Sequence, residues 1–200
     1  APTYFLWGDG DPFGGADGML SQYVTLSEAG LAKIPGGLSY EEAATLPCAG
    51  VTAYSALKKA APLGEGDTLL VIGAGGVGLS AVRLARRLHP DARVVVAEVD
   101  ASKADLARAA AAIDFVGAGD TFAFGFGAVR KGGKLVCVGL FGGSTPIVPV
   151  MVAMKAITVT GSYVGSLSEL RELLALAQDG TLPALPLDQR PLDGATQALA

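Results

Sequence analysis

A glycine-rich stretch that follows an apolar run is the feature that most restricts how this chain can fold. Thr68–Ile72 is a short run of aliphatic side chains, typical of a strand buried on both faces of a sheet. It ends in residues 73–78, Gly-Ala-Gly-Gly-Val-Gly, which match the pattern G-x-G-x-x-G. Apolar residues then recur at helical spacing as far as Leu88. A strand, a glycine turn and a helix in this order predict a dinucleotide-binding α/β unit.

Each glycine of the turn has a predicted task. Gly73 allows a tight turn, Gly75 lets the backbone approach a pyrophosphate, and Gly78 lets the helix pack closely on the strand. Gly76 and Val77 belong to the same turn at the start of the helix. The N–H groups of that first turn, together with the helix dipole, favour a bound diphosphate. The alternative is a glycine-rich turn of an ordinary α/β protein without a ligand.

Composition narrows the class of protein. Half of the 200 residues are hydrophobic and 17% are charged, which indicates a compact globular chain. The net charge of −4 and the scattered basic residues argue against nucleic acid as a partner. No apolar run has the length of a membrane span. Two cysteines make no disulfide framework, so we expect a reducing compartment, the cytoplasm. Because the sequence starts with Ala1 and not Met, we expect residues to precede it.

The remaining elements are predicted from periodicity and capping residues. Ser39 and Glu42 form a capping box for a short helix that Pro47 should end. A linker is expected over 32–37. Gly132 and Gly133 are expected to cap the helix before them, and Ser168 to cap the last helix, which ends at Gly180. The expected strands are 19–26, 68–72, 93–100, 112–117, 134–139 and 156–161, and the expected helices are 51–60, 77–88, 102–112, 120–129 and 168–180.

Glu98 lies 25 residues after Gly73, close to the spacing of the acidic residue that binds an adenosine ribose. A carboxylate there accepts hydrogen bonds from the ribose hydroxyls and repels a 2′-phosphate, so NAD is favoured over NADP. The alternative is an ordinary solvated charge at the end of a strand.

One half of a doubly wound sheet usually has three strands, yet the sequence passes directly from the helix after Glu98 to the strand at 112–117. Either the domain is abridged or residues are missing near 109–112, and we favour missing residues.

Several segments together resemble the medium-chain dehydrogenase/reductase superfamily, and within it the zinc-dependent alcohol dehydrogenases. The resemblance covers about residues 14–200, and its motifs occur in the family's order. They are 19–24 (Met-Leu-Ser-Gln-Tyr-Val), 42–54 (Glu-Ala-Ala-Thr-Leu-Pro-Cys-Ala-Gly-Val-Thr-Ala-Tyr), the glycine turn, 132–136 (Gly-Gly-Lys-Leu-Val) and 161–165 (Gly-Ser-Tyr-Val-Gly).

The resemblance implies a doubly wound Rossmann sheet of α/β class and the remnant of a β-rich, GroES-like catalytic domain. The implied divisions are 1–47 for the end of the catalytic domain and a linker, 48–185 for the NAD-binding domain, and 186–200 for the start of a return to the catalytic domain. The implied activity is interconversion of an alcohol and an aldehyde or ketone, with NAD and zinc as cofactors.

The resemblance also implies roles for individual residues. Cys48 matches the third ligand of the family's catalytic zinc, and its predicted place ahead of a helix start favours a thiolate. Thr52 matches a residue beside the nicotinamide ring. Residues matching the adenosine ribose site and the walls of the cofactor cleft are Glu98, Lys103, Val116, Val138, Leu140, Ser162 and Tyr163.

The sequence departs from the family at the metal. The other catalytic ligands come from a part of the family's N-terminal domain that these residues lack, and the four-cysteine structural zinc loop is absent as well. The one histidine, His89, is assigned to the end of a surface helix, where a cation suits the dipole. Since a catalytic zinc needs about three protein ligands, we expect these 200 residues to bind the cofactor without completing the zinc site.

Two other functions remain open at this point. One is a zinc-free NAD(P)H quinone or enone reductase of the same superfamily, in which Cys48 is a small buried hydrophobe. The other is a non-catalytic dinucleotide-binding module. The apolar strand over 157–160 predicts assembly edge to edge into a homodimer or homotetramer.

Overall fold

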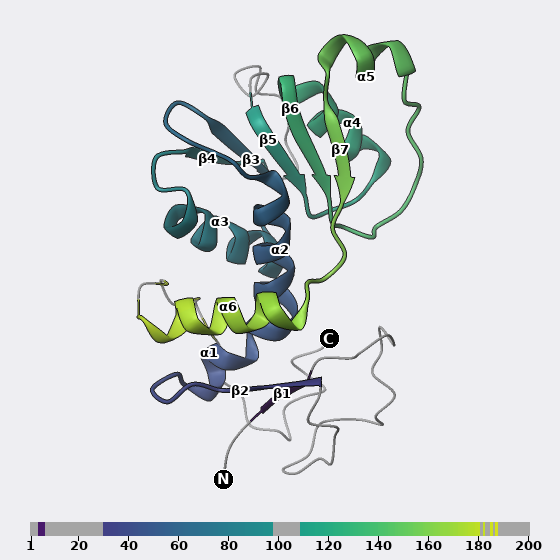
Figure 1. Cartoon of the computed structure of the whole chain (residues 1–200). Helices are drawn as coiled ribbons and strands as arrows, with labels where there is room; N and C mark the ends of the chain where they lie inside the picture. Colours follow the sequence, from purple (N-terminus) through teal and green to yellow (C-terminus); the bar gives the residue numbers. More distant parts are fainter. Residues whose placement is uncertain are drawn as a thin grey trace.

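A parallel five-stranded sheet forms the centre of the structure, a computed structural model (Figure 1). The structure describes residues 4–6, 30–97 and 109–180, with the single residues 182, 185 and 187. The strands follow the order β4-β3-β5-β6-β7, and each neighbouring pair is parallel. Their bounds are β3 Thr68–Ile72, β4 Arg93–Ala97, β5 Ala109–Asp114, β6 Val129–Cys137 and β7 Thr158–Gly161. The predicted α/β class is therefore confirmed.

Alternation along the strands divides the core into two layers. On β3, Leu69 and Val71 join the cluster under α2 (Val51–Ala60), α3 (Gly76–Leu88) and α6 (Leu167–Gln178). Leu70 and Ile72 point to the other face, toward α4 (Gly119–Ala128) and α5 (Pro149–Lys155). Both faces of the sheet are covered by helices, which is why β3 is apolar throughout. The doubly wound arrangement expected from the sequence is confirmed.

The central strand β5 begins earlier than predicted, and the helix expected over 102–112 was wrong at its end. Residues 109–112 are four alanines, which favour a helix on propensity alone. In the structure they are consecutive residues of β5, each at most 8% exposed, between β3 and β6. Burial between two strands outweighs their weak helical preference.

The helix cap predicted at Gly132 and Gly133, between α4 and β6, was wrong. α4 ends at Ala128 and β6 starts at once with Val129, so Gly132 and Gly133 lie inside β6 and cap no helix. The register of β5 and β6 shifts opposite them, and Gly132 takes a φ of 76°. An added Cβ at Gly133 would lie 2.7 Å from the Ala110 carbonyl oxygen, so the close approach of two backbones requires glycine there.

Two helix ends also differ from expectation. Ser39 caps α1 (Tyr40–Ala44) as predicted, with its hydroxyl accepting from the Glu42 N–H at 3.2 Å. Pro47 does not stop the helical path, because it opens a π-helical turn, Leu46–Gly50, where its missing N–H is not needed. The cap of α6 is Ser166 in a capping box with Glu169, two residues before the predicted Ser168.

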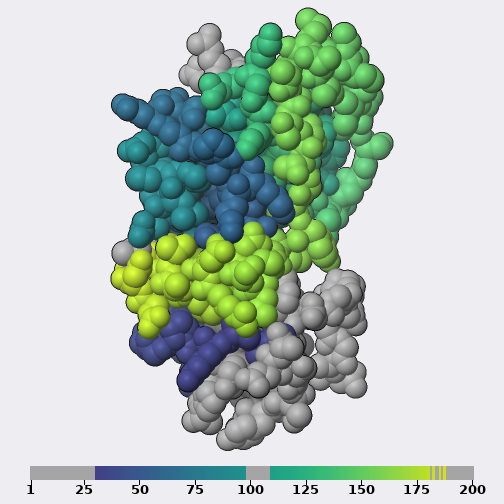
Figure 2. All heavy atoms as spheres, in the orientation of Figure 1, coloured from purple at the N-terminus to yellow at the C-terminus, as the bar shows by residue number. Residues whose placement is uncertain are grey.

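The N-terminal part contributes a small antiparallel pair, β1 (Tyr4–Leu6) with β2 (Leu31–Lys33). The linker expected over 32–37 is thus partly a strand. In Figure 2, α6 lies between the sheet-bearing part and the residues of β2 and α1. The strand expected over 19–26 lies outside the described residues. None of the helices in the described ranges is long and apolar enough to cross a membrane.

Candidate dinucleotide-binding site

The turn between β3 and α3 has the geometry that its glycines predict. Gly73 has a φ of 92°, in the left-handed region where a Cβ is strained. An added Cβ at Gly78 would lie 2.0 Å from the Gly73 carbonyl oxygen, so the first turn of α3 can approach β3 this closely only with glycine. Gly75 adopts an extended conformation and caps α3 without a side-chain hydrogen bond.

The open side of the turn is at Gly75 and Gly76. An added Cβ at either glycine would meet no described atom within 4 Å. The helix that begins here is 13 residues long, so its first-turn N–H groups carry the partial positive charge of a full helix dipole. Backbone donors, an open approach and positive potential suit a diphosphate at this turn.

Residues that follow the other strands lie beside this turn. Val116 follows β5, and its side chain lies 2.9 Å from the position of a Cβ on Gly73. Val138 follows β6 and donates its N–H to the Asp114 carbonyl oxygen at 2.9 Å. Leu140 is 79% exposed at the same end of β6. The structure thus brings Gly73, Val116 and Val138 together at the carboxyl ends of parallel strands, where ligands of open α/β sheets bind.

The chain after β7 contributes a buried and an exposed position. The Ser162 side chain is 4% exposed and its hydroxyl accepts a hydrogen bond from Lys59 Nζ at 2.8 Å. Tyr163, the next residue, is 61% exposed.

The two residues assigned to the adenosine ribose, Glu98 and Lys103, lie outside the described residues. Ala97, which ends β4, accepts a hydrogen bond from the Gly73 N–H at 2.9 Å. β4 therefore ends beside the glycine turn, and Glu98 is the next residue along the chain.

Cys48 is exposed on the π-helical turn that leads directly into α2. The N–H of Val51 is engaged with carbonyl oxygens of that turn, those of Cys48 and Leu46. The start of α2 is therefore not the open helix end on which the expectation of a thiolate partly rested. Thr52 is half-buried in the first turn of α2.

The described residues do not form a zinc site by themselves. No group of three His, Cys, Asp or Glu side chains among residues 4–6, 30–97 and 109–180 could hold a metal ion. Cys48 is one candidate ligand, and a catalytic zinc requires about three protein ligands.

His89 and Cys137 have structural environments. His89 lies at the end of α3, as predicted. Burial lowers the pKa of its imidazole, although a hydrogen bond with the Leu63 backbone opposes this, so burial disfavours the cationic form there. Burial raises the pKa of the Cys137 thiol on β6, and the Asp114 carboxylate adds to the effect. Cys137 packs against the core.

Asp114 is a residue of this region that sequence reasoning missed. It is fully buried at the end of β5, and Oδ1 accepts from the N–H groups of Val116 and Gly117. A short polar residue directly before a glycine-containing strand end is a signal of such a turn, since Asp and Asn side chains accept from the backbone two or three residues ahead.

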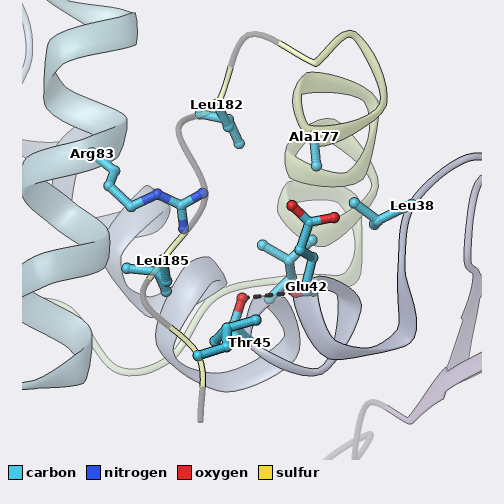
Figure 3. A pocket seen from close by; sticks show the side chains of 9 residues that line it. Leu38, Glu42, Thr45, Arg83, Ala177, Leu182 and Leu185 are labelled. Carbon is cyan, nitrogen blue, oxygen red and sulfur yellow. Dashed lines mark hydrogen bonds between the residues drawn. The ribbon is translucent and has the colours of Figure 1, made fainter. Parts of the chain in front are cut away.

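A separate pocket lies among α1, α3 and α6 (Figure 3). The Arg83 side chain points into it, and Arg83 Nε has no hydrogen-bond acceptor among the described residues. Burial lowers the pKa of Arg83, while the charge of Glu42 raises it. The space that the centre of a water molecule can occupy is about 20 Å³, room for little more than one water. This pocket contains none of the strand-end residues and is not the candidate site.

Known proteins share this arrangement. A family model described as zinc-binding dehydrogenase matches residues 108–179. A probable cinnamyl alcohol dehydrogenase of Lolium perenne is 29% identical over 217 residues, covering 97% of this chain and 58% of that protein. The alcohol dehydrogenase of the archaeon Aeropyrum pernix superposes with a TM-score of 0.78 at 29% identity, covering 94% of this chain and 62% of that one. The chain is therefore similar to zinc-binding dehydrogenases, and in particular to alcohol dehydrogenases.

These matches confirm the resemblance found in the sequence. An alcohol dehydrogenase of Geobacillus stearothermophilus is also 29% identical, over 202 residues that cover 88% of this chain and 59% of that protein. The chain spans little more than half the length of these curated relatives. The part matched by the family model contains β5, β6 and β7 of the parallel sheet.

Proposed function

We propose that this chain is the NAD(H)-binding part of a zinc-dependent oxidoreductase that interconverts an alcohol and an aldehyde or ketone. The observation that carries the proposal is the glycine turn, where Gly78 packs against the Gly73 carbonyl and Gly75 lies open at the start of α3. The relatives named alcohol dehydrogenase support the reaction class. The proposed NAD-binding domain is 48–185, flanked by parts of a catalytic domain.

The chain's own residues bind and orient the dinucleotide. The backbone of residues 73–78 and the first turn of α3 hold the diphosphate. Val116, Val138 and Leu140 flank the cofactor at the strand ends, with the backbone of Ser162 and the ring of Tyr163 beyond them. Glu98 and Lys103 are the proposed partners of the adenosine ribose, and Thr52 is placed beside the nicotinamide. When bound, NAD(H) supplies the hydride acceptor or donor.

Cys48 is the proposed thiolate ligand of a catalytic zinc, whose chemistry would be that of a Lewis acid toward the substrate oxygen. The match to the zinc-binding dehydrogenase model supports this part of the proposal. The described residues contain no group of three possible ligands, so the other ligands would come from residues outside those described. A metal-binding thiol in place of a disulfide fits a reducing compartment, the cytoplasm.

The test measures zinc content and NAD-linked oxidation of alcohols in the full-length protein, with Cys48→Ala beside the wild type. We expect about one catalytic zinc per chain, and loss of both zinc and alcohol oxidation in the variant. Cys137→Ala is the matched control, because that thiol lies in the core of β6. A protein without zinc, whose activity is unchanged by Cys48→Ala, would contradict the zinc proposal.

A zinc-free quinone or enone reductase of the same superfamily is the second candidate, in which Cys48 would bind no metal. The same preparation distinguishes the two. Reduction of quinones with NADPH and without zinc would support the second candidate. Dinucleotide binding with neither activity in the full-length protein would indicate a non-catalytic module.

A further inference from the structure

The side chain of Asp114 joins three segments at the end of the sheet. Its Oδ1 accepts hydrogen bonds from the Val116 N–H at 2.9 Å and the Gly117 N–H at 3.0 Å. Its Oδ2 accepts from the Thr121 hydroxyl at 2.8 Å, on the first turn of α4. The Thr121 hydroxyl in turn accepts from the Ala118 N–H at 3.0 Å. One fully buried carboxylate thereby satisfies the donors of the loop between β5 and α4.

The same loop determines the position of the neighbouring one. The N–H groups of Val138 and Gly139 donate to the Asp114 carbonyl oxygen at 2.9 and 3.0 Å, and the Phe141 N–H donates to Val116 at 3.2 Å. Gly117 has a φ of 73°, and an added Cβ there would lie 1.9 Å from the Gly139 carbonyl oxygen. The two loops are therefore in backbone contact, and a shift of one moves the other.

We propose that Asp114 is a positioning residue that holds the Val116 and Val138 loops in the conformation that receives the dinucleotide. This inference rests on the proposed function, because it concerns the same strand-end site. Without the carboxylate, the half-buried N–H groups of Val116 and Gly117 lose their acceptor, and the Thr121 hydroxyl keeps only the Ala118 carbonyl. We expect the loop from Phe115 to Ala118 to move so that these N–H groups find another acceptor. Misplacing a binding surface by about 1 Å is enough to weaken binding strongly.

The experiment compares Asp114→Ala with Asp114→Asn by titration of NADH at 20 °C, where both variants are shown to be folded by circular dichroism. Asn keeps an oxygen for the Val116 and Gly117 N–H groups. Its amide can donate to the Thr121 hydroxyl, which still donates to the Ala118 carbonyl at 3.0 Å. We expect the NADH dissociation constant to rise at least about tenfold in Asp114→Ala and to stay within about threefold in Asp114→Asn.

Leu174→Ala is the matched control for a loss of stability alone, since Leu174 is buried on α6, an element that contains neither loop. It should lower the melting temperature while leaving NADH affinity unchanged. Wild-type affinity in Asp114→Ala would overturn the inference, as would equal losses in the Ala and Asn variants. A wild-type protein that does not bind NADH would instead overturn the proposed function.

Discussion

Two glycines of the turn after β3 differ in the space around them. Substitution of Gly75 should therefore affect cofactor binding alone, whereas substitution of Gly78 should also reduce the stability of the fold. Gly75 has φ −67° and ψ −174°, values that alanine adopts freely, and an added Cβ there meets no described atom within 4 Å. We expect Gly75→Ala to change the free energy of unfolding by less than about 0.5 kcal/mol. Its methyl group would occupy the approach of the diphosphate, so the NADH dissociation constant should rise by about tenfold or more.

Gly78→Ala should reduce both the affinity for NADH and the free energy of unfolding. The added Cβ would lie 2.0 Å from a backbone oxygen that cannot rotate away, so we expect a loss of about 2 kcal/mol or more of unfolding free energy. Gly127→Ala, on α4 with open space around it, is the control and should leave NADH affinity unchanged. Denaturant unfolding and NADH fluorescence titration measure the two effects. Unaltered NADH binding in Gly75→Ala would contradict the assignment of the turn.

The tasks of Gly73 and Gly78 could be predicted because they follow from local sterics within six consecutive residues. The part played by Asp114 could not, since it depends on Thr121 and on a loop after β6 that the sequence does not place nearby. The burial of Arg83 Nε without an acceptor among the described residues could not be predicted either, because it results from the way α1 and α6 pack around α3.

At the level of helices and strands, the cap of α6 offers a direct test. The Ser166 hydroxyl accepts from the Glu169 N–H at 3.2 Å, and Glu169 returns the interaction by accepting from the Ser166 N–H at 2.7 Å. We expect Ser166→Ala to lower the free energy of unfolding by about 1 kcal/mol. Ser168→Ala, at the cap predicted from the sequence, should cost clearly less. Denaturant unfolding measures both free energies, and a larger loss of unfolding free energy in Ser168→Ala than in Ser166→Ala would contradict the observed cap.

Tyr54 connects α2 to α6 through a hydrogen bond from its hydroxyl to Glu172 at 2.8 Å. Burial, followed by this hydrogen bond, raises the pKa of Tyr54 to about 12. An unfolded tyrosine titrates near 10. Because the folded state holds the proton more tightly, this contribution to stability is complete below pH 10 and is lost as the pH rises from 10 toward 12.

The corresponding variant is Tyr54→Phe. Between pH 8 and pH 11, we expect the wild type to lose about 1 kcal/mol more unfolding free energy than this variant. Tyr163→Phe is the control, because its ring is 61% exposed and should keep the wild-type pH dependence. Identical pH profiles for the wild type and Tyr54→Phe would rule out this role.

Elements with a strong apolar period were predicted to within a residue or two, such as β3, α2 and α4. The errors lie at residues whose local conformational preference differs from what their surroundings in the folded chain require. Alanines 109–112 favour a helix locally yet fill a narrow space between two strands. Gly132 and Gly133 resemble a helix cap but serve a close contact inside β6.

On the scale of the whole molecule, the sheet exposes an apolar edge. Among the described strands, β7 pairs only with β6, and Val159 on it is 39% exposed. Beside it, α5 exposes Val150 and Met154, and an apolar groove separates α5 and the preceding loop from α4. An exposed strand edge flanked by apolar surface favours pairing with another strand. We therefore propose assembly edge to edge into a homodimer or homotetramer.

A two-fold axis at this edge would bring each copy of β7 against the other, so a charge introduced there meets itself. We expect Val159→Lys to shift the mass measured by light scattering toward the monomer, with the fold retained by circular dichroism. Val96→Lys is the matched control, since Val96 is 42% exposed on β4, at the other end of the described sheet, and should leave the mass unchanged. A monomeric wild type, or equal effects of the two lysines, would show that β7 is not the joining edge.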